Sequence, residues 1–232
     1  MTQPNFDHIA RIYRWAEYLS LGPLLQRTRT HFLPQLPTLH RALIHGDGDG
    51  RFLAQLLSTQ PQLQALAVDT SATMLHLLRT RCRSHADQLQ TLQTSALDLT
   101  SATDGYPKPS GLGFISCENE KGVLTPDLIT THFFLDCLTQ PEVDTLTRNL
   151  ASTLQPGALW LLSDFGQPHP RLLRPFAALY IRALYLAFRI LTGLRVTHLP
   201  DPQSALRDAG FHLTARHELL SGLIYTEIWQ YQ

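Results

Sequence analysis

The sequence has few of the features that would assign it to several large classes of protein. It contains only three cysteines, Cys82, Cys117 and Cys137, and they form neither a CxxC pair nor a Cys/His cluster. This spacing argues against a disulfide framework and a structural zinc site, so we expect a reducing compartment and no bound metal. The 19 basic and 19 acidic residues give a formal net charge of 0. The chain therefore lacks the basic excess that is typical of nucleic-acid-binding domains.

Long apolar runs are also missing. No segment reaches the ~18 uninterrupted apolar residues of a conventional transmembrane helix. The first residues include Asp7 and contain no apolar stretch of the kind found in secretory signals. What is present is a chain of 232 residues with 44% hydrophobic content, enough for one sizeable core. We expect a cytoplasmic protein.

Short apolar runs alternate along the chain with segments that are compatible with helices. Such alternation is typical of βαβ units and predicts an α/β protein with a mostly parallel sheet. The apolar runs are residues 42–45, 63–68, 89–92, 127–134 and 158–165, and the helix-compatible segments are residues 50–57, 72–86 and 141–153.

Both ends of the sequence differ from this pattern. Residues 6–33 have apolar positions at helical spacing, and we expect Gly22-Pro23 to stop a helix there. Residues 210–220 and 223–231 are two strand-like runs that meet at Ser221-Gly222. These two adjacent runs predict a terminal antiparallel hairpin.

Two further segments interrupt the alternation. Residues 100–126 are rich in turn-forming residues and long for a connection between strands, so they are either a surface insertion or a loop that covers a substrate. Residues 171–194 are apolar nearly all round and are punctuated by four arginines. This segment has three interpretations: a helix buried under the sheet, a lid over an apolar substrate, or an interfacial helix on a membrane. The arginines are Arg171, Arg174, Arg182 and Arg189.

The stretch Gly46-Asp47-Gly48-Asp49-Gly50 follows the first apolar run and precedes a helix-compatible segment. Glycines at the end of a buried strand allow a tight turn and the close approach of a ligand to the backbone. The next helix offers its free N–H groups to that ligand. A dinucleotide fingerprint, GxGxxG, would place its third glycine at Arg51, so that fingerprint is broken. The spacing GxGxG is the one found in proteins that bind a nucleoside sulfonium.

Asp69 ends the next apolar run, 19 residues after Gly50. A carboxylate at the tip of a second strand can accept hydrogen bonds from both hydroxyls of a ribose. The alternative is that Asp69 only caps the helix that starts near Ser71. Together with the glycine loop, Asp69 indicates a nucleoside ligand, although the same pair would also suit NAD.

These landmarks resemble those of the class I S-adenosylmethionine-dependent methyltransferases, from about residue 41 to the end. GDGDG (46–50), VDTSATML (68–75), PDLITTHFF (126–134) and LQPGALWLLSDF (154–165) are similar to four motifs of that family. The resemblance implies a three-layer Rossmann-like fold. Its sheet would have seven strands, mostly parallel with the last antiparallel, and helices on both faces.

A narrower resemblance links the N-terminal FDHIARIYRWAEYLSLG (6–22) to the ubiquinone/menaquinone-biosynthesis methyltransferases. SDF (163–165) and AGF (209–211) are also similar to that group. The group usually has Asp after the tyrosine that corresponds to Tyr13, whereas this chain has Arg14.

The family resemblance implies S-adenosyl-L-methionine as the cofactor and a set of residues that bind it. Two departures stand out. The acidic residue usually found two places before the first glycine is Ile44 here, so Asp47 and Asp49 are the available substitutes. The family's Asp-Ala pair near the adenine is Ser95-Ala96, which leaves Asp98 as a substitute. The implied cofactor-binding residues are Gly46, Asp47, Gly48, Asp49, Gly50, Asp69, Thr70, Met74, Ser95, Ala96, Leu97 and Thr131.

The acceptor is expected beyond the carboxyl end of the fourth strand, because ligands of open α/β sheets bind outside strand carboxyl ends. His132 and Phe133 lie there, and Tyr13 of the N-terminal segment is a further candidate for contact with the substrate. His132 is either a general base or a packing residue, and Tyr13 is a second catalytic candidate. Asp136 is expected to cap or pack against the following helix.

We therefore expect an N-terminal helical cap (1–40) followed by a methyltransferase domain (41–232) that acts on a small, apolar, quinone-like or otherwise lipophilic molecule. No nucleic-acid partner is expected, transient membrane contact through 171–194 is considered, and the oligomeric state is left open. Two alternatives remain: a non-catalytic nucleoside-binding protein of the same fold, and an NAD(P)-dependent oxidoreductase.

Overall fold

A computed structural model describes residues 21–101, 125–192 and 199–232 of the chain. Its sheet contains the seven strands β1 (Arg41–His45), β2 (Gln64–Asp69), β3 (Leu89–Gln93), β4 (Leu128–His132), β5 (Leu159–Phe165), β6 (Phe211–Leu219) and β7 (Ile224–Tyr231). The α-helices of the described residues are α2 (Gly22–Thr30), α3 (Arg51–Thr59), α4 (Ala72–Arg81), α5 (Ala96–Ser101), α6 (Gln140–Ala151), α7 (Arg174–Thr192) and α8 (Pro202–Asp208). Short 3-10 turns are η1 (Leu33–Gln35), η2 (Arg83–Gln88), η3 (Leu135–Cys137) and η4 (Leu220–Gly222).

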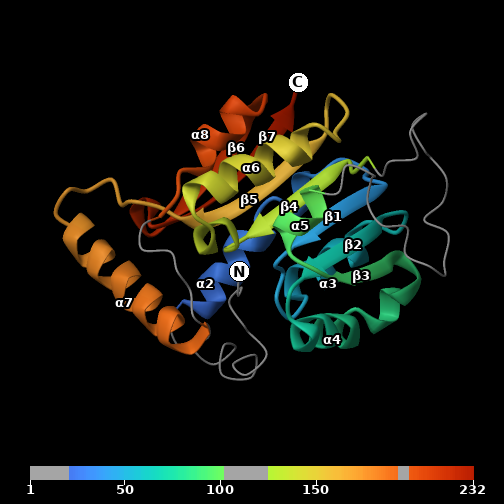
Figure 1. The fold of residues 1–232 in the computed structure, drawn as a ribbon, viewed down its shortest axis with the longest axis horizontal. Helices are drawn as coiled ribbons and strands as arrows, with labels where there is room; N and C mark the ends of the chain where they lie inside the picture. Colours follow the sequence, from blue (N-terminus) through green and yellow to red (C-terminus); the bar gives the residue numbers. More distant parts are fainter. Residues whose placement is uncertain (1–20, 102–124, 193–198) are drawn as a thin grey trace.

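The strands form one sheet in the order β3-β2-β1-β4-β5-β7-β6 (Figure 1). The pairs from β3 through to β5 are parallel, whereas β7 pairs antiparallel with both β5 and β6. The predicted fold is thereby confirmed, including the antiparallel last strand and the hairpin around Ser221-Gly222.

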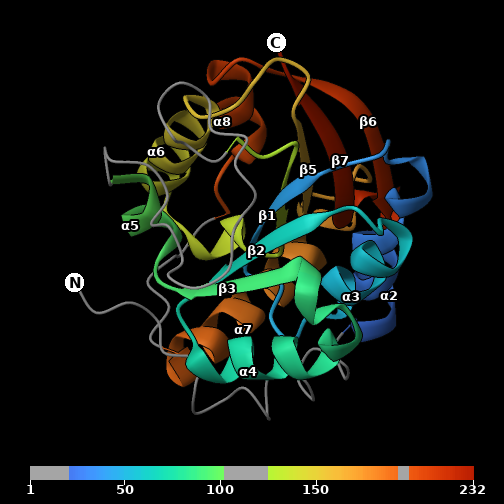
Figure 2. The ribbon, with the colours of Figure 1, turned by 90° about the vertical axis from the view of Figure 1, so that its right-hand side faces the viewer.

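The two faces of the sheet are covered by different helices, as Figure 2 shows with α2 and α3 on one side and α5, α6 and α8 on the other. Strand β1 shows how one strand contacts the helices on both faces, because successive side chains of a strand point to opposite faces of the sheet. Ile44 packs in the cluster that contains Phe52 of α3, while Leu43 packs in the cluster that contains Leu146 of α6. Each of these four side chains is at most 1% exposed, so both layers of the core are closed.

The expected stop of a preceding helix at Gly22-Pro23 concerns residues 1–20, which lie outside the described residues, so it stays a prediction. Helix α2 begins at Gly22, and its second residue is Pro23. Proline suits the first turn of a helix, since its fixed φ is helical and its missing N–H would have had no partner in the helix. Residues 1–20, with Tyr13, and residues 102–124 of the insertion lie outside the described residues.

The segment 171–194 is not a helix buried under the sheet. Over the side chains that are described, Leu172, Phe176 and Leu179 are 85%, 71% and 68% exposed, and Figure 1 places α7 to one side of the sheet. Its inward contacts come from Ala177 and Ile181, which are buried. The other two interpretations, a lid and an interfacial helix, remain open. Within the described residues, no helix has the length and apolar character needed to cross a membrane.

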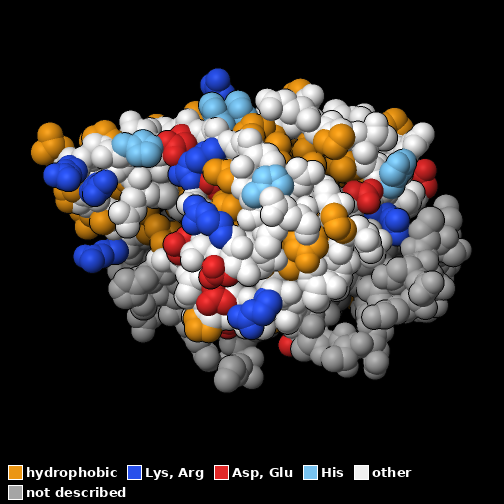
Figure 3. Space-filling model, turned by 90° about the horizontal axis from the view of Figure 1, so that it is seen from above, with side chains coloured by type: hydrophobic (Ala, Val, Ile, Leu, Met, Phe, Trp, Pro, Cys, Tyr) orange, Lys and Arg blue, Asp and Glu red, His pale blue; other side chains and the backbone are white. Residues whose placement is uncertain are grey.

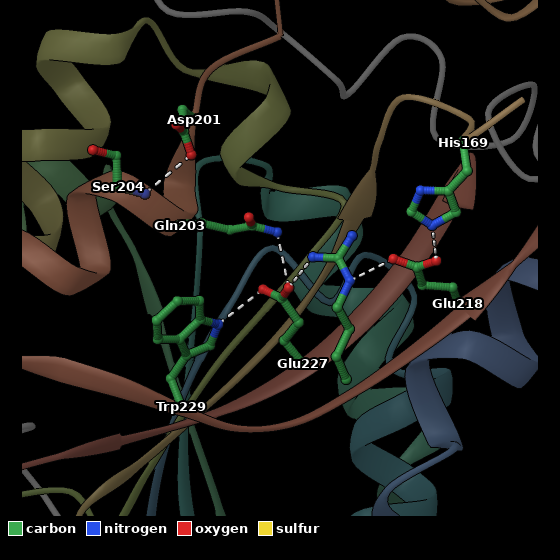
Figure 4. A network of polar contacts seen from close by, with 8 residues as sticks. His169, Asp201, Gln203, Ser204, Glu218, Glu227 and Trp229 are labelled. Atoms are coloured by element: carbon green, nitrogen blue, oxygen red, sulfur yellow. Dashed lines mark hydrogen bonds and ion pairs between the residues drawn. The ribbon is translucent and has the colours of Figure 1, made fainter. Parts of the chain in front are cut away.

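The antiparallel end of the sheet is held by a polar network around Glu227, which is fully buried in β7 (Figure 4). Its carboxylate accepts hydrogen bonds from Arg216 of β6, from Gln203 Nε2 of α8 at 2.8 Å and from Trp229 Nε1 at 2.9 Å. Arg216 also pairs with Glu218. Burial raises the pKa of Glu227, against the opposing effect of these donors. We therefore expect the network to depend on the positive charge of Arg216, which pairs with the buried carboxylate of Glu227.

Replacing that cation should destabilise the fold. We expect Arg216→Ala to lower the free energy of unfolding by about 3 kcal/mol, because it leaves a buried carboxylate without its ion-pair partner. Urea denaturation measures the change. Arg148→Ala, at an exposed arginine of α6, is the control and should cost under ~0.5 kcal/mol. Adding Glu227→Gln to Arg216→Ala should recover part of the loss, and no recovery would show that the charge is not the cause.

Candidate active site at the carboxyl ends of the strands

The carboxyl ends of β1, β2 and β3 lie side by side and bring three predicted segments together. In the β1–β2 register His45 is opposite Val68, and Gly46 N donates to Val68 O at 3.3 Å, so the glycine loop starts level with Asp69. On the other side, Thr94 N donates to Asp69 O at 3.1 Å, immediately before Ser95. Three segments that are far apart in the sequence thus form one row along a single edge of the sheet.

The three loop glycines all adopt left-handed conformations, with φ of 64° at Gly46, 62° at Gly48 and 79° at Gly50. Their surroundings differ. A Cβ at Gly50 would lie 2.9 Å from Leu78 Cγ and 3.0 Å from Leu78 Cα, so the glycine allows α3 and α4 to pack closely. At Gly48 a Cβ would meet no atom within 4 Å. The backbone at Gly48 is therefore the part of the loop that a ligand can approach.

Asp69 is not the cap of the helix that follows it. The N-cap of α4 is Ser71, whose Oγ accepts from Met74 N at 3.1 Å. Asp69 Oδ1 instead accepts from Ser71 N at 2.8 Å, which fixes the carboxylate at the strand tip. The capping alternative was thus wrong, while the proposed contact with a ribose stays a prediction.

The other residues of this row occupy the turns after β2 and β3. Thr70 is exposed, and its carbonyl accepts from Gln93 Nε2 at 3.2 Å. Ser95 Oγ accepts from Leu97 N at 3.1 Å at the start of α5. Asp98 lies in the first turn of α5 and is exposed, whereas Met74 and Ala96 are buried. Contact of these residues with a cofactor stays a prediction.

Asp47 and Asp49 are engaged within the protein. Asp47 is buried, and its Oδ2 accepts from Leu53 N at 2.9 Å in the first turn of α3. Asp49 pairs with Arg51 at 3.0 Å and with Arg81 at 2.8 Å, which ties the loop to the end of α4. These contacts favour structural roles for both carboxylates. Their substitution for the acid missing at Ile44 stays a prediction.

Phe134 and His45 form an aromatic pair that the sequence did not single out. Their rings are stacked at a centroid distance of 5.9 Å and an interplanar angle of 16°. Phe134 Cδ2 lies 2.6 Å from the position that a Cβ at Gly46 would occupy, so the ring covers the start of the glycine loop. His45 is 1% exposed, and neither of its ring nitrogens has a hydrogen-bond partner among the described residues. Burial lowers its pKa to about 4.

The two residues after β4 pack in different places. Phe133 packs away from the glycine loop, whereas Phe134 packs against Gly46 of that loop. Phe133 has a left-handed φ of 54°, and its ring packs with Leu25 of α2, Phe165 and Ile224. Non-glycine residues in this conformation are uncommon and concentrate at functional sites. Because of this turn, the two adjacent aromatic rings pack on different sides of the end of β4: Phe133 on the cluster with Leu25, and Phe134 on His45.

His132 lies on the α3 face and not at the open edge. Its Nδ1 is 2.9 Å from Ser163 Oγ, and its ring meets Phe52 edge-on at 4.3 Å. Burial, and then the charge of Arg29, lowers its pKa well below the ordinary value, so the imidazole is neutral near pH 7. Thr131 is also fully buried and accepts from Trp160 Nε1 at 2.8 Å. These positions favour packing roles, and the catalytic role of His132 stays a prediction.

Asp136 and Asp164 form a buried acidic pair at the ends of β4 and β5. Asp136 does not cap α6, because the N-cap is Thr139 in a capping box with Glu142. Burial raises the pKa of Asp136 to about 6, and burial together with the charge of Asp136 raises the pKa of Asp164 well above its ordinary value. Asp164 Oδ2 has no hydrogen-bond partner among the described residues. No local pattern in the sequence points to this pair, since the two strand ends are far apart along the chain.

Two kinds of comparison with known proteins bear on this geometry. A family model described as a methyltransferase domain matches residues 43–160, about half of the chain. The search of curated proteins found no match to the chain. An O-methyltransferase family protein from Burkholderia thailandensis has a TM-score of 0.67 at 17% identity, with 96% of this chain and 59% of that one covered.

Two other solved structures are also similar. An O-methyltransferase family 2 protein from Planctomyces limnophilus DSM 3776, in complex with apigenin, has a TM-score of 0.64 at 17% identity, covering 96% and 62% of the two chains. The S-adenosylmethionine-dependent methyltransferase SibL, in its apo form, has a TM-score of 0.60 at 19% identity, covering 100% and 63%. At these identities the likeness establishes the fold, and this chain spans about three-fifths of the length of these structures.

The glycine surroundings predict different costs for two alanine substitutions. Gly48→Ala should lower the free energy of unfolding by about 1–2 kcal/mol, the cost of a left-handed non-glycine residue. Gly50→Ala should cost a further ~1–3 kcal/mol, because its Cβ would overlap Leu78. Urea denaturation of the two variants provides the comparison. Equal losses would mean that α3 and α4 separate readily at this point.

Burial of His45 makes stability depend on pH. The folded pKa of about 4 lies below the ordinary 6.5, so protonation favours the unfolded chain. The contribution is complete above about pH 6.5 and is lost as the pH falls toward 4. We expect the stability of the native protein relative to His45→Gln to decrease by about 3 kcal/mol over this range, measured by urea denaturation. Other titrating groups cancel in the difference, and a flat difference would contradict the assignment.

Proposed function

We propose, from the premise that this chain belongs to the methyltransferase-domain family whose model matches residues 43–160, that it transfers a methyl group from S-adenosyl-L-methionine to a small molecule. S-adenosylmethionine is the usual cofactor of such domains. The rest of the proposal concerns how this chain would hold the cofactor and which acceptor it would take.

One observation carries the proposal: the approachable backbone at Gly48 and the carboxylate of Asp69 lie on adjacent strand ends. Gly46 N, at the start of the loop, donates a hydrogen bond to Val68 O of β2. Asp69 directly follows Val68, so its carboxylate lies next to the start of the loop. A backbone that no side chain covers and an acidic side chain one strand away match a ligand with a charged amino-acid part and a ribose. The space at Gly48 fits such a ligand, since no atom beyond Gly48 and its two chain neighbours lies within 4 Å of the position of a Cβ there.

The cofactor supplies an activated methyl carbon, and transfer is an in-line displacement in which the acceptor forms the new bond as the carbon–sulfur bond breaks. The protein's part is to bind, orient and exclude water. Asp69 would accept the ribose hydroxyls, and the turns at Thr70 and Ser95 would flank the base. Phe134, stacked on His45, would close the side of the loop where Gly46 leaves no room for a side chain.

The acceptor is proposed to be lipophilic. Apolar side chains gather near the ends of β4 and β5, where Phe133, Phe165, Leu25 and Ile224 form one cluster. The Planctomyces limnophilus protein is in complex with apigenin, a small aromatic molecule, and a molecule of this kind is compatible with such apolar surroundings. A quinone-like acceptor, Tyr13 as a contact to it, and the N-terminal cap of residues 1–40 remain parts of the proposal.

A non-catalytic cofactor-binding protein is the second candidate. Ile44 is buried in the core, and both Asp47 and Asp49 have partners inside the protein, so the acid expected near the methionine end has no evident replacement. Cofactor binding alone does not separate the two candidates. Release of S-adenosylhomocysteine in the presence of a panel of lipophilic phenols and quinols does. An oxidoreductase is disfavoured by Arg51, which stands where a dinucleotide loop has its third glycine.

Asp69→Ala tests the cofactor site. We expect S-adenosylmethionine to bind about 30–150-fold more weakly in calorimetric titration, because two charge-assisted hydrogen bonds are lost. Asp87→Ala, at an exposed acid of η2, is the matched control and should bind normally.

The melting temperature distinguishes the possible outcomes. Weaker binding with a nearly unchanged melting temperature supports the ribose contact. Unchanged binding with a lower melting temperature would mean that Asp69 serves only its hydrogen bond to Ser71 N, and the cofactor site would then be misplaced.

A further inference from the structure

The start of α7 presents an apolar stripe to the outside of the molecule. Phe176 and Leu179 are three residues apart in α7, which places them on one side of the helix, and Leu172 lies in the turn just before α7, four residues before Phe176. Leu172, Phe176 and Leu179 are 85%, 71% and 68% exposed, and Leu173 beside them is 45% exposed. Four of the six most exposed large apolar side chains of the described residues thus lie within eight consecutive positions. We call these four residues the α7 stripe.

The opposite side of the same helix is the one that packs on the protein. Ala177 and Ile181 are four residues apart and are both 8% exposed. Ile181 lies in a cluster with Tyr180, Cys137, Leu199 and Leu223, next to the ends of β4 and β7. Over its described side chains the helix therefore has two apolar sides, one that packs on the fold and one that is largely exposed.

The charged side chains of the segment that carries the stripe are of one sign. Between Asp164 and Asp201 the sequence has no acidic residue, although it has five arginines, at positions 171, 174, 182, 189 and 195. Arg171, Arg174 and Arg182 are exposed next to the stripe. Orange and blue side chains lie together at the left end of the molecule in Figure 3, the end that carries the start of α7 in Figure 1. This local excess contrasts with the chain's formal net charge of 0.

We propose that the α7 stripe docks on an anionic lipid bilayer, with the helix lying along the surface. A helix with large apolar residues on one side, flanked by arginines and without acids, fits the boundary between acyl chains and negatively charged headgroups. The stripe enters the acyl region, and Arg171 and Arg182 reach the phosphates. A second copy of the chain is a poorer occupant, because a symmetric α7–α7 contact would bring arginines of both copies together in an apolar interface.

This surface lies beside the candidate site. Ile181, on the inner side of α7, contacts the cluster that includes Cys137, the residue after Asp136. Docking through the stripe would hold the ends of β4 and β5 close to the bilayer, where a lipophilic molecule is concentrated. The docking itself does not rest on the proposed function, since it requires neither cofactor nor acceptor.

Vesicle co-sedimentation tests the proposal with the full chain. The probes are vesicles of phosphatidylcholine alone and vesicles of equal parts phosphatidylcholine and phosphatidylglycerol. We expect binding to the anionic vesicles only, weakened by salt. The double substitution Phe176→Ser with Leu179→Ser should weaken it at least tenfold. Arg171→Gln with Arg182→Gln should weaken it roughly 25-fold, about fivefold for each arginine near the surface.

Matched controls use exposed residues elsewhere. Leu213→Ser with Leu220→Ser removes two apolar side chains that are 41% and 45% exposed, and Arg83→Gln with Arg148→Gln removes two exposed arginines. Both controls should bind anionic vesicles as the native chain does.

Three results would overturn the proposal: no sedimentation with anionic vesicles, equal weakening by the control pairs, or native binding by the stripe variant. Light scattering adds a further arm. A native dimer that the stripe variant converts to a monomer, without vesicle binding by either, would assign the stripe to a second copy of the chain. Binding of the stripe to a soluble acidic protein, without binding to anionic vesicles, would likewise refute lipid docking.

Discussion

The parallel register between β1 and β2 is the constraint on which the candidate site depends. His45 opposite Val68 sets the level at which the two strands end, and the hydrogen bond from Gly46 to Val68 O continues the ladder by one residue into the loop. A shift of one residue would turn every side chain of a strand to the other face of the sheet. It would exchange Ile44 and Leu43 between the two cores and would also separate the loop from Asp69. The packing of both faces therefore holds the site in place.

The loop itself is stabilised by its two acidic side chains, which have partners within the protein. Asp47 holds the first turn of α3, and Asp49 joins the loop to α4 through Arg81. Both carboxylates are thereby directed into the protein, while the backbone between them stays uncovered at Gly48. This division would allow the proposed cofactor to approach the main chain of a loop that contains two acids. The acids fix the shape, and the glycine provides the approach.

Much of the architecture could be predicted from the sequence, because local signals determine it. Runs of apolar residues fixed the strands to within one or two residues, and the glycine spacing located the loop. The signals failed where the outcome depends on distant partners. Gly22-Pro23 indicated a break between helices, but the sequence did not show that a helix, α2, begins at Gly22. His132 faces α3 because it shares a face of β4 with Leu128, and Phe133, with its left-handed φ, packs with Phe165 and Ile224 from distant strands. The pairing of Asp136 with Asp164 requires two strands to be adjacent, which no local pattern records.

The position of β7 has a consequence for the order in which the chain folds. Strand β6 is at the edge of the sheet and pairs with β7, while β7 pairs with β5 on its other side. During synthesis the earlier strands can assemble as they emerge, since each finds its neighbours among segments already made. Strand β6 cannot join them directly, because its place is one strand away from β5. Until the last strand is complete, β5 presents an open edge, and an open edge of this kind is where other chains pair and aggregate. The ion pair of Arg216 with Glu227 forms only when β7 pairs with β6, so the strand that covers the edge of β5 also completes the polar network.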